Sequence, residues 1–256
     1  MSTVVLTLKQ LTYENKSFWR NPASAFFTFA FPLMFLFIFN LIFGGDDFGP
    51  PGQEVSGSTF YVPAIAAFSV ITACYTNIAI SVTFLRDEGV LKRVRGTPLP
   101  PLSYLVARMI HSTFIAVLLV AIVSVAGVLL YDVEFPSGQV LELLLIVAVG
   151  AFTFSALGLA MTSFIPNADA APPMVNATIL PLLFISDVFI PLTDAPSWLE
   201  TVAKIFPIWH YAHSMLSVFD PFEPSFYEAG NLWVVAAWGV AATLVAARFF
   251  SWEPRK

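Results

Sequence analysis

Long uncharged apolar runs constrain the fold of this chain more than any other feature of its sequence. Of its 256 residues, 57% are hydrophobic and 11% are charged, whereas a soluble domain carries about 25% charged residues. A helix of about 20 apolar residues is long enough to cross the hydrocarbon core of a bilayer. We therefore expect a polytopic membrane protein of the all-α class, in which residues 1–256 form a single transmembrane domain.

Six runs are long and apolar enough to be predicted as membrane spans. None alternates apolar and polar residues, as the strands of a membrane barrel do. The fifth run carries Asp187 near its end. The predicted spans are residues 23–43, 60–85, 107–131, 143–165, 171–190 and 229–249. An even number of spans places both termini on the same side of the membrane.

Lysine and arginine are distributed unevenly between the two sides that six spans define. Eleven of the 12 lie in the N-terminal segment, around the loop after the second span or at the C-terminal end, and only Lys204 lies on the other side. Cytoplasmic loops of membrane proteins carry an excess of these two residues. We therefore expect a multi-pass protein of the cell (plasma) membrane with both termini in the cytoplasm.

Two further segments are apolar without being predicted spans. Residues 1–22 place Val4, Leu8 and Leu11 on one helical face, which is typical of an amphipathic helix lying at the membrane interface. An anchor without a mechanical role is the alternative for this segment. Residues 191–228 are too apolar for a free loop and are interrupted at Pro207, so we expect an outer re-entrant segment of helices packed on protein.

The most charged stretch, "LRDEGVLKRVRGTPLPP", lies between the second and third spans. Its spacing predicts a helix of about three turns that Gly96 and Pro98 end. One interpretation is a docking surface, and the other is a solvated loop that only sets the topology. The residues that would form the surface are Arg86, Asp87, Glu88, Val90, Leu91, Lys92, Arg93, Val94 and Arg95, within a loop of residues 86–101.

No motif for nucleotide hydrolysis or for hydrolytic catalysis is present in the sequence. We therefore predict no catalytic residues, no metal site and no cofactor on this chain. His210 and His213 have helical spacing, but no cysteine or carboxylate cluster completes a ligand set. The single cysteine, Cys74, excludes an intrachain disulfide.

A few polar residues lie within the apolar runs. Thr72, Thr76 and Asn77 in the second span, with Asn176 in the fifth, are candidates to line a substrate pathway, and hydrogen bonds between helices are the alternative explanation. Asp187 is also a pathway candidate, because an ionisable residue at the edge of a span is a functional candidate by default.

The order of these segments resembles the type-two ABC exporter permeases, which include daunorubicin-type drug exporters and polysaccharide and lipid exporters. The charged stretch resembles the most recognisable motif of the family, and "ISDVFIPLTDAPSWLETVAKIFPIWHYAHSML" is similar to a second, looser motif. At Asp187 the family often has a small residue such as glycine, so the chain differs from the pattern there.

The resemblance implies that the charged stretch is the coupling helix, which docks on a separate ATP-binding cassette subunit. ATP and Mg would lie on that subunit, and a second permease chain, identical or different, would complete the transporter in the lipid membrane. The implied cargo is a hydrophobic or amphipathic drug, lipid or glycolipid, and no nucleic acid is implied. An ion-coupled secondary transporter is the alternative; it would need an intramembrane ion site and an internal repeat.

Overall fold

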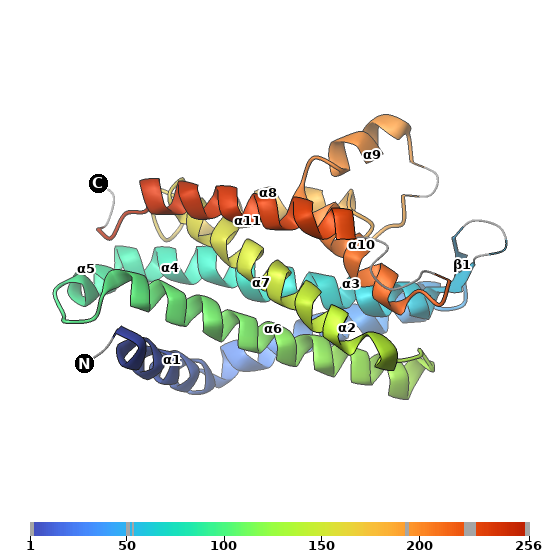
Figure 1. Ribbon diagram of the computed structural model, residues 1–256, viewed down its shortest axis with the longest axis horizontal. Coiled ribbons are helices and arrows are strands. Elements are labelled where there is room, and N and C mark those ends of the chain that lie inside the picture. Colours follow the sequence, from blue (N-terminus) through green and yellow to red (C-terminus); the bar gives the residue numbers. More distant parts are fainter. Residues whose placement is uncertain (1–2, 50–51, 53, 193–194, 223–228, 254–256) are drawn as a thin grey trace.

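The computed structural model describes residues 3–49, 52, 54–192, 195–222 and 229–253. These residues form an elongated bundle of helices with one short hairpin, in which β1 (Asp47–Phe48) pairs antiparallel with β2 (Val55–Ser56) (Figure 1). The predicted all-helical architecture is confirmed apart from this hairpin.

The helices follow the predicted order along the chain. Three of them, α2, α6 and α10, begin at a proline, whose fixed φ suits the first helical position. The elements are α1 (Thr3–Trp19), α2 (Pro22–Phe43), α3 (Gly57–Ile71), the π-helix η1 (Thr72–Thr76), α4 (Asn77–Asp87), α5 (Val90–Arg95), α6 (Pro101–Tyr131), the 3₁₀ turn η2 (Ser137–Gln139), α7 (Val140–Thr162), α8 (Ala171–Phe184), α9 (Ser197–Ala203), α10 (Pro207–Phe219) and α11 (Ala229–Phe249).

Five helical stretches among the described residues are long and apolar enough to cross a membrane, as expected for a polytopic membrane protein. The predicted fifth span, residues 171–190, is shorter than expected, because α8 ends at Phe184 after 14 residues. Asp187 follows with a φ of 56°, a left-handed conformation that no helix continues through. A helix of this length extends about 21 Å, which is less than the roughly 30 Å of hydrocarbon in a bilayer.

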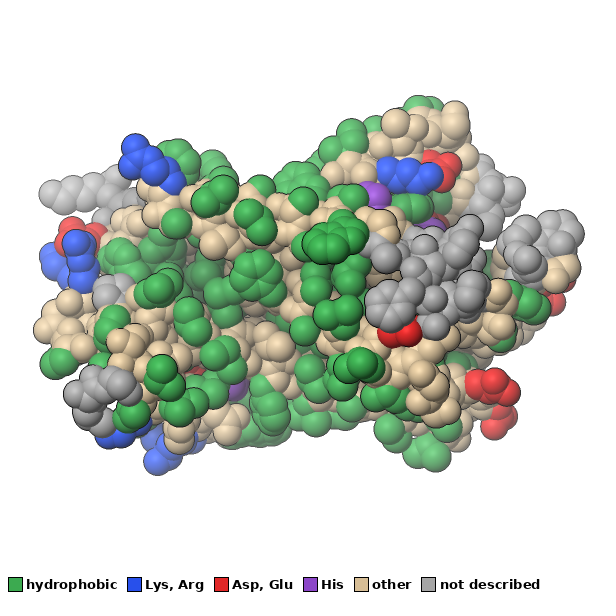
Figure 2. All heavy atoms as spheres, viewed as in Figure 1, with side chains coloured by type: hydrophobic (Ala, Val, Ile, Leu, Met, Phe, Trp, Pro, Cys, Tyr) green, Lys and Arg blue, Asp and Glu red, His purple; other side chains and the backbone are tan. Residues whose placement is uncertain are grey.

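The bundle has two distinct ends. In Figure 1, α1, α5 and the last turn of α11 lie at one end, which we call the α5 end, and β1 and α9 lie at the other, the β1 end. Most of the lysine and arginine side chains on the face in Figure 2 lie at the α5 end, one lies toward the β1 end, and apolar side chains cover the middle. The charge separation predicted from the sequence is therefore present in the folded chain.

The middle of the bundle is built around α3. Val62, Ile65 and Ala66 have no exposed surface, and α3 packs on α2, α6, α7 and α10. Small residues let helices approach closely where no solvent drives them together. Gly158 of α7 is one such place, since a Cβ there would lie 2.8 Å from the carbonyl oxygen of Tyr75.

The outer segment contains two helices, α9 and α10, and the second starts at Pro207 as the sequence predicts. Helix α10 is largely buried and packs on α3, α7 and α11, with the Tyr211 ring seated against Gly150. Helix α10 is thus packed on protein, whereas most residues of α9 are exposed; that the segment is re-entrant stays a prediction. Residues 193–194 and 223–228 of the predicted segment lie outside the described residues.

Candidate functional site

The charged stretch does not form the continuous three-turn helix that its spacing predicts. Helix α4 continues through Arg86 to Asp87, and Gly89 adopts a left-handed φ of 71° before α5 begins at Val90. Glycine adopts this conformation at little cost and commonly ends a helix. The result is a short helix, α5, set at an angle to the end of α4 at the α5 end of the bundle (Figure 1).

One face of α5 is basic and exposed, and the other is held by the chain itself. Lys92, Arg93 and Arg95 are exposed, as is Glu88 before the turn. Leu91 has no exposed surface and packs in a cluster with Tyr104 and Ile78, which Val94 also contacts. Leu91 is therefore covered by this chain in this conformation, whereas Val94 is half-buried; their part in the docking surface stays a prediction. Val90 is half-buried.

Arg86 is buried to 1% exposure, so it is not part of the exposed basic face. Its Nη1 donates to the carbonyl oxygen of Thr162 at 2.8 Å, and its Nη2 donates to those of Ile165 at 2.8 Å and Pro166 at 3.3 Å. Asp87 lies beside it, 3.5 Å from Nε, and accepts a hydrogen bond from the Ala168 amide at 2.6 Å. Both terminal nitrogens of Arg86 thus bond within this chain in this conformation, and its place in the docking surface stays a prediction.

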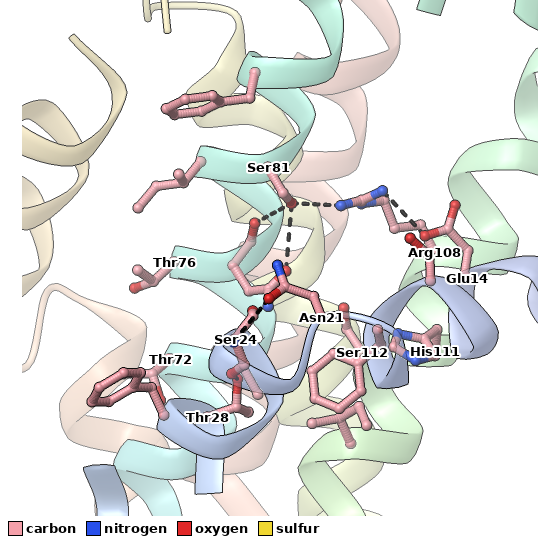
Figure 3. Close-up of a pocket in the computed structure, with 18 of the residues that line it drawn as sticks. Glu14, Asn21, Ser24, Thr28, Thr72, Thr76, Ser81, Arg108, His111 and Ser112 are labelled. Carbon is pink, nitrogen blue, oxygen red and sulfur yellow. Dashed lines mark hydrogen bonds and ion pairs between the residues drawn. The ribbon is translucent and has the colours of Figure 1, made fainter. Parts of the chain in front are cut away.

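A cavity of about 760 Å³ lies between α1, α2, α6 and the helix formed by η1 and α4. This volume is typical of ligand pockets. Its wall combines hydroxyl and amide groups with aromatic rings, as shown in part in Figure 3. The polar residues of the wall include Asn21, Ser24, Thr28, Thr72, Thr76, Asn77, Ser81 and Ser112, and the aromatic ones are Phe18, Phe27, Phe31, Phe84 and His111.

A polar network joins three helices at one side of this cavity. Arg108 of α6 donates to Ser81 of α4 at 2.6 Å and pairs with Glu14 of α1 at 3.2 Å (Figure 3). Ser81 in turn donates to the backbone oxygen of Asn77. Arg108 and Glu14 are 12% and 13% exposed, so each needs the other to offset the loss of hydration. The network fixes α1 against the bundle.

Three of the predicted pathway residues, Thr72, Thr76 and Asn77, line this one cavity. They lie in or next to η1, where the Asn77 amide bonds to the Thr72 oxygen five residues earlier instead of four. Single π turns inside α-helices are frequent at functional sites. The sequence indicated these polar residues but gave no sign of the wide turn that presents them.

The other two predicted pathway residues lie elsewhere. Asn176 is on an exposed face of α8. Asp187 lines a second pocket of about 500 Å³, whose wall includes Phe48 of β1. Its carboxylate accepts from the Leu192 amide at 2.6 Å and lies 3.0 Å from His213 Nε2. The five residues are thus split between two pockets and one surface.

The two histidines of α10 do not converge. His210 contacts the oxygen of Lys204 and the side chain of Asn231, while His213 contacts Asp187 and stacks on Trp209. In the part of the chain that the structure describes, no group of three or more His, Cys, Asp or Glu side chains is placed to hold a metal ion.

Sequence reasoning missed the roles of Glu14 and Arg108: Arg108 entered only the charge count that assigns topology, and Glu14 was not singled out. A signal was present, because Arg108 falls at the start of an otherwise apolar run and Glu14 lies within the amphipathic segment. Charged residues in such positions usually pair with one another or face a cavity.

Comparisons with known proteins agree with this geometry. The family model described as "ABC-2 type transporter" matches residues 8–219, well over half of the chain. The protein YvfS of Bacillus subtilis (strain 168), named as a transport permease, is 23% identical over 203 residues, which cover 79% of this chain and 81% of that protein. The daunorubicin resistance ABC transporter permease protein DrrB1 of Streptomyces coeruleorubidus is 25% identical over 247 residues, 94% of this chain and 83% of that protein.

A third relative is the probable multidrug ABC transporter permease YbhR of Escherichia coli (strain K12), which is 23% identical over 152 residues, 59% of this chain and 41% of that protein. The family match covers α2 through α10, including the first cavity and the basic helix. The sequence motifs, the helical bundle and the family match agree, and the chain belongs to the ABC-2 type transporter family as a membrane permease without an ATPase site of its own.

Proposed function

We propose that this permease exports a hydrophobic or amphipathic molecule, a drug, lipid or glycolipid, with energy from ATP hydrolysed on a separate ATP-binding cassette subunit. Permeases of this family pair with such a subunit, and the ATP and Mg would be bound there. A second permease chain, either a copy of this one or a related chain, completes the transporter in the cell membrane.

The proposal rests on one observation, which is that α5 exposes basic side chains on one side and is packed against the bundle on the other. Lys92, Arg93 and Arg95 are exposed together on a short helix whose opposite side is fixed by the buried Leu91. A basic patch of this kind is suited to an acidic partner surface, where charges steer association and set the register. Because the buried Leu91 packs α5 against the core of this chain, a displacement of α5 is transmitted to the bundle.

The orientation of the bundle follows from its charge. The α5 end carries most of the lysine and arginine residues, and these are enriched on the cytoplasmic side of membrane proteins. We therefore place α1, α5 and both termini in the cytoplasm, where ATP is present. The β1 end and the Asp187 pocket then face the outside.

The cavity beside η1 is the proposed start of the pathway. Thr72, Thr76 and Asn77 supply hydrogen-bonding groups, and Phe27 and Phe31 of α2 supply apolar surface in the same wall. A molecule with a polar head and an apolar body matches such a wall. Asp187 is the proposed contact at the outer end, and Asn176 on the surface of α8 is the least supported of the candidates.

The test is a double charge reversal on α5. Lys92→Glu with Arg93→Glu places like charges against an acidic partner and should cost several kcal/mol if the contacts are close. The control is Lys9→Glu with Lys16→Glu, which makes the same charge change on exposed positions of α1. Both are reconstituted with the ATP-binding subunit, and subunit binding, ATPase rate and transport of daunorubicin are measured.

The α5 variant should lose subunit binding and transport, and the α1 variant should keep both. Normal binding and normal stimulated ATPase activity in the α5 variant would contradict the docking role. Transport by the permease alone, driven by an ion gradient with no ATP-binding subunit present, would instead favour the ion-coupled alternative.

A further inference from the structure

The most buried charged side chain among the described residues is Arg86, and its acceptors include three backbone oxygens of one distant stretch of the chain. It donates to the backbone oxygens of Thr162, Ile165 and Pro166, which lie at the end of α7 and in the connection to α8. The end of a helix leaves carbonyl groups without intrahelical partners and carries partial negative charge. Arg86 therefore binds the C-terminal end of α7 by both charge and hydrogen bonding.

Asp87 makes a second connection between the last turn of α4 and the segment that follows α7. Its carboxylate accepts from the Ala168 amide at 2.6 Å while it lies 3.5 Å from Arg86 Nε. The two residues occupy the last turn of α4, directly before Gly89 and α5. They thus connect the base of α5 to residues 162–168.

We propose that Arg86 and Asp87 are positioning residues that make the end of α4, helix α5 and the connection between α7 and α8 move as one unit. The proposal rests on the docking role of α5 proposed above. It assigns these two residues to force transmission within the permease and not to contact with the ATP-binding subunit. A displacement of α5 then moves α8 as well as α4.

The link continues from α8 to the cavity. Thr178 of α8 donates its hydroxyl proton to the Val175 oxygen at 2.8 Å, so the Tyr75 hydroxyl donates to Thr178 at 2.6 Å. Tyr75 belongs to η1, the wide turn in the cavity wall. A movement of α5 therefore reaches η1 along two routes, directly through α4 and through residues 162–168 and α8.

Arginine suits this position for a geometric reason. Its planar group offers several donors in a fixed fork, and here two nitrogens reach three carbonyl groups of one turn. Lysine would keep the charge but offers a single point of attachment. Glutamine would remove the charge and shorten the reach.

The experiment uses the permease reconstituted with its ATP-binding subunit, in the forms Arg86→Gln, Arg86→Lys and Asp87→Ala. Asp87 is 22% exposed, so its truncation is less disruptive to folding than a change at Arg86. Arg20→Gln is the matched control, because it removes the same charge at an exposed position. Hydrogen–deuterium exchange is followed in α5 and in residues 162–184, with and without ATP, together with subunit binding and daunorubicin transport.

In the wild-type complex and in Arg20→Gln, ATP should change exchange both in α5 and in residues 162–184. In Arg86→Gln and Asp87→Ala the subunit should still bind, the change should be confined to α4 and α5, and transport per ATP should fall by about 5- to 150-fold, the range of a typical coupling between sites. Arg86→Lys should show an exchange response and a transport per ATP between those of the wild type and those of Arg86→Gln. An undiminished exchange response and normal transport in Asp87→Ala would overturn the proposal, as would loss of subunit binding in that variant. Failure of the docking proposal is recognised separately, because then the α5 charge reversal leaves subunit binding intact.

Discussion

Replacing Gly158 by alanine tests the closest approach between α7 and the π-helical turn η1. A Cβ at this position would lie 2.8 Å from the Tyr75 oxygen, 3.3 Å from the Cys74 oxygen and 3.3 Å from Ile78 Cβ. The nearest of these groups is backbone, so it cannot rotate away as a side chain would. Helix α7 must shift by roughly half an ångström or more, or η1 must change its shape.

The expected decrease in the free energy of unfolding is the difference between two opposing effects. Inserting a methyl group into a packed interface costs about 1–3 kcal/mol, and replacing glycine by alanine inside a helix returns up to about 1 kcal/mol. Taking the middle of the first range, about 2 kcal/mol, and subtracting the second leaves a net destabilisation of about 1–2 kcal/mol. For a chain of this size each kcal/mol lowers the transition temperature by about 2–4 °C, so a decrease of about 2–8 °C is expected.

The chain carries its own reporter for this contact. Cys74 is the only cysteine in the sequence, it lies in η1, and it has no exposed surface. A thiol-reactive fluorescent dye therefore reacts only when the bundle opens around η1. The assay is the temperature at which the purified permease becomes reactive toward the dye.

The control is Gly230→Ala, which makes the same change in α11, where no atom of the described residues lies within 4 Å of the new Cβ. Its transition temperature should not fall. Equal transition temperatures for Gly158→Ala and wild type would refute the argument that this glycine is required by the contact with η1. An equal fall in Gly230→Ala would show that the effect is not specific to that contact.

Three further predictions concern other parts of the bundle. Tyr75→Phe removes the hydrogen bond to Thr178 and should cost about 0.5–1.5 kcal/mol, visible in the same thiol assay as a decrease of a few degrees; an unchanged transition would contradict a contribution from this bond. Asp187→Leu should be less stable than Asp187→Asn, because asparagine tolerates the left-handed φ of 56° and leucine pays about 1–2 kcal/mol for it; the reverse order in the assay would count against that explanation. In intact cells, Glu54→Cys should react with an impermeant maleimide and Arg93→Cys should not, and the opposite pattern would reverse the proposed orientation.

The sequence predicted the helical class, most helix positions and three of the polar residues that line the cavity. Apolar run length and the prolines at residues 22, 101 and 207 carry this information locally. The break at Gly89 was also signalled, since a glycine between two helical segments is a common helix end. The helical spacing of the surrounding charges masks this signal.

The role of Arg86 could not be predicted in the same way. Its acceptors are backbone oxygens 76 to 80 residues further along the chain, and a backbone oxygen has no signature in the sequence. From the sequence alone, an arginine with basic residues beside it is therefore expected to be exposed. The pairing of Arg108 with Glu14, 94 residues apart, is hidden for the same reason, as is the left-handed turn at Asp187.

The shortness of α8 has a practical consequence for anyone who tags this protein. Counting only helices long enough to cross a membrane gives five among the described residues, and an odd count would put the two chain ends in different compartments. In the folded chain, both ends lie at the same end of the bundle. Phe250 and Trp252, after α11, pack in the same cluster as Leu91 of α5, and α1 lies at that end too (Figure 1). Reporter domains fused to the two ends of the described chain should therefore emerge into one compartment. An automated span count based on helix length would misread such a fusion experiment.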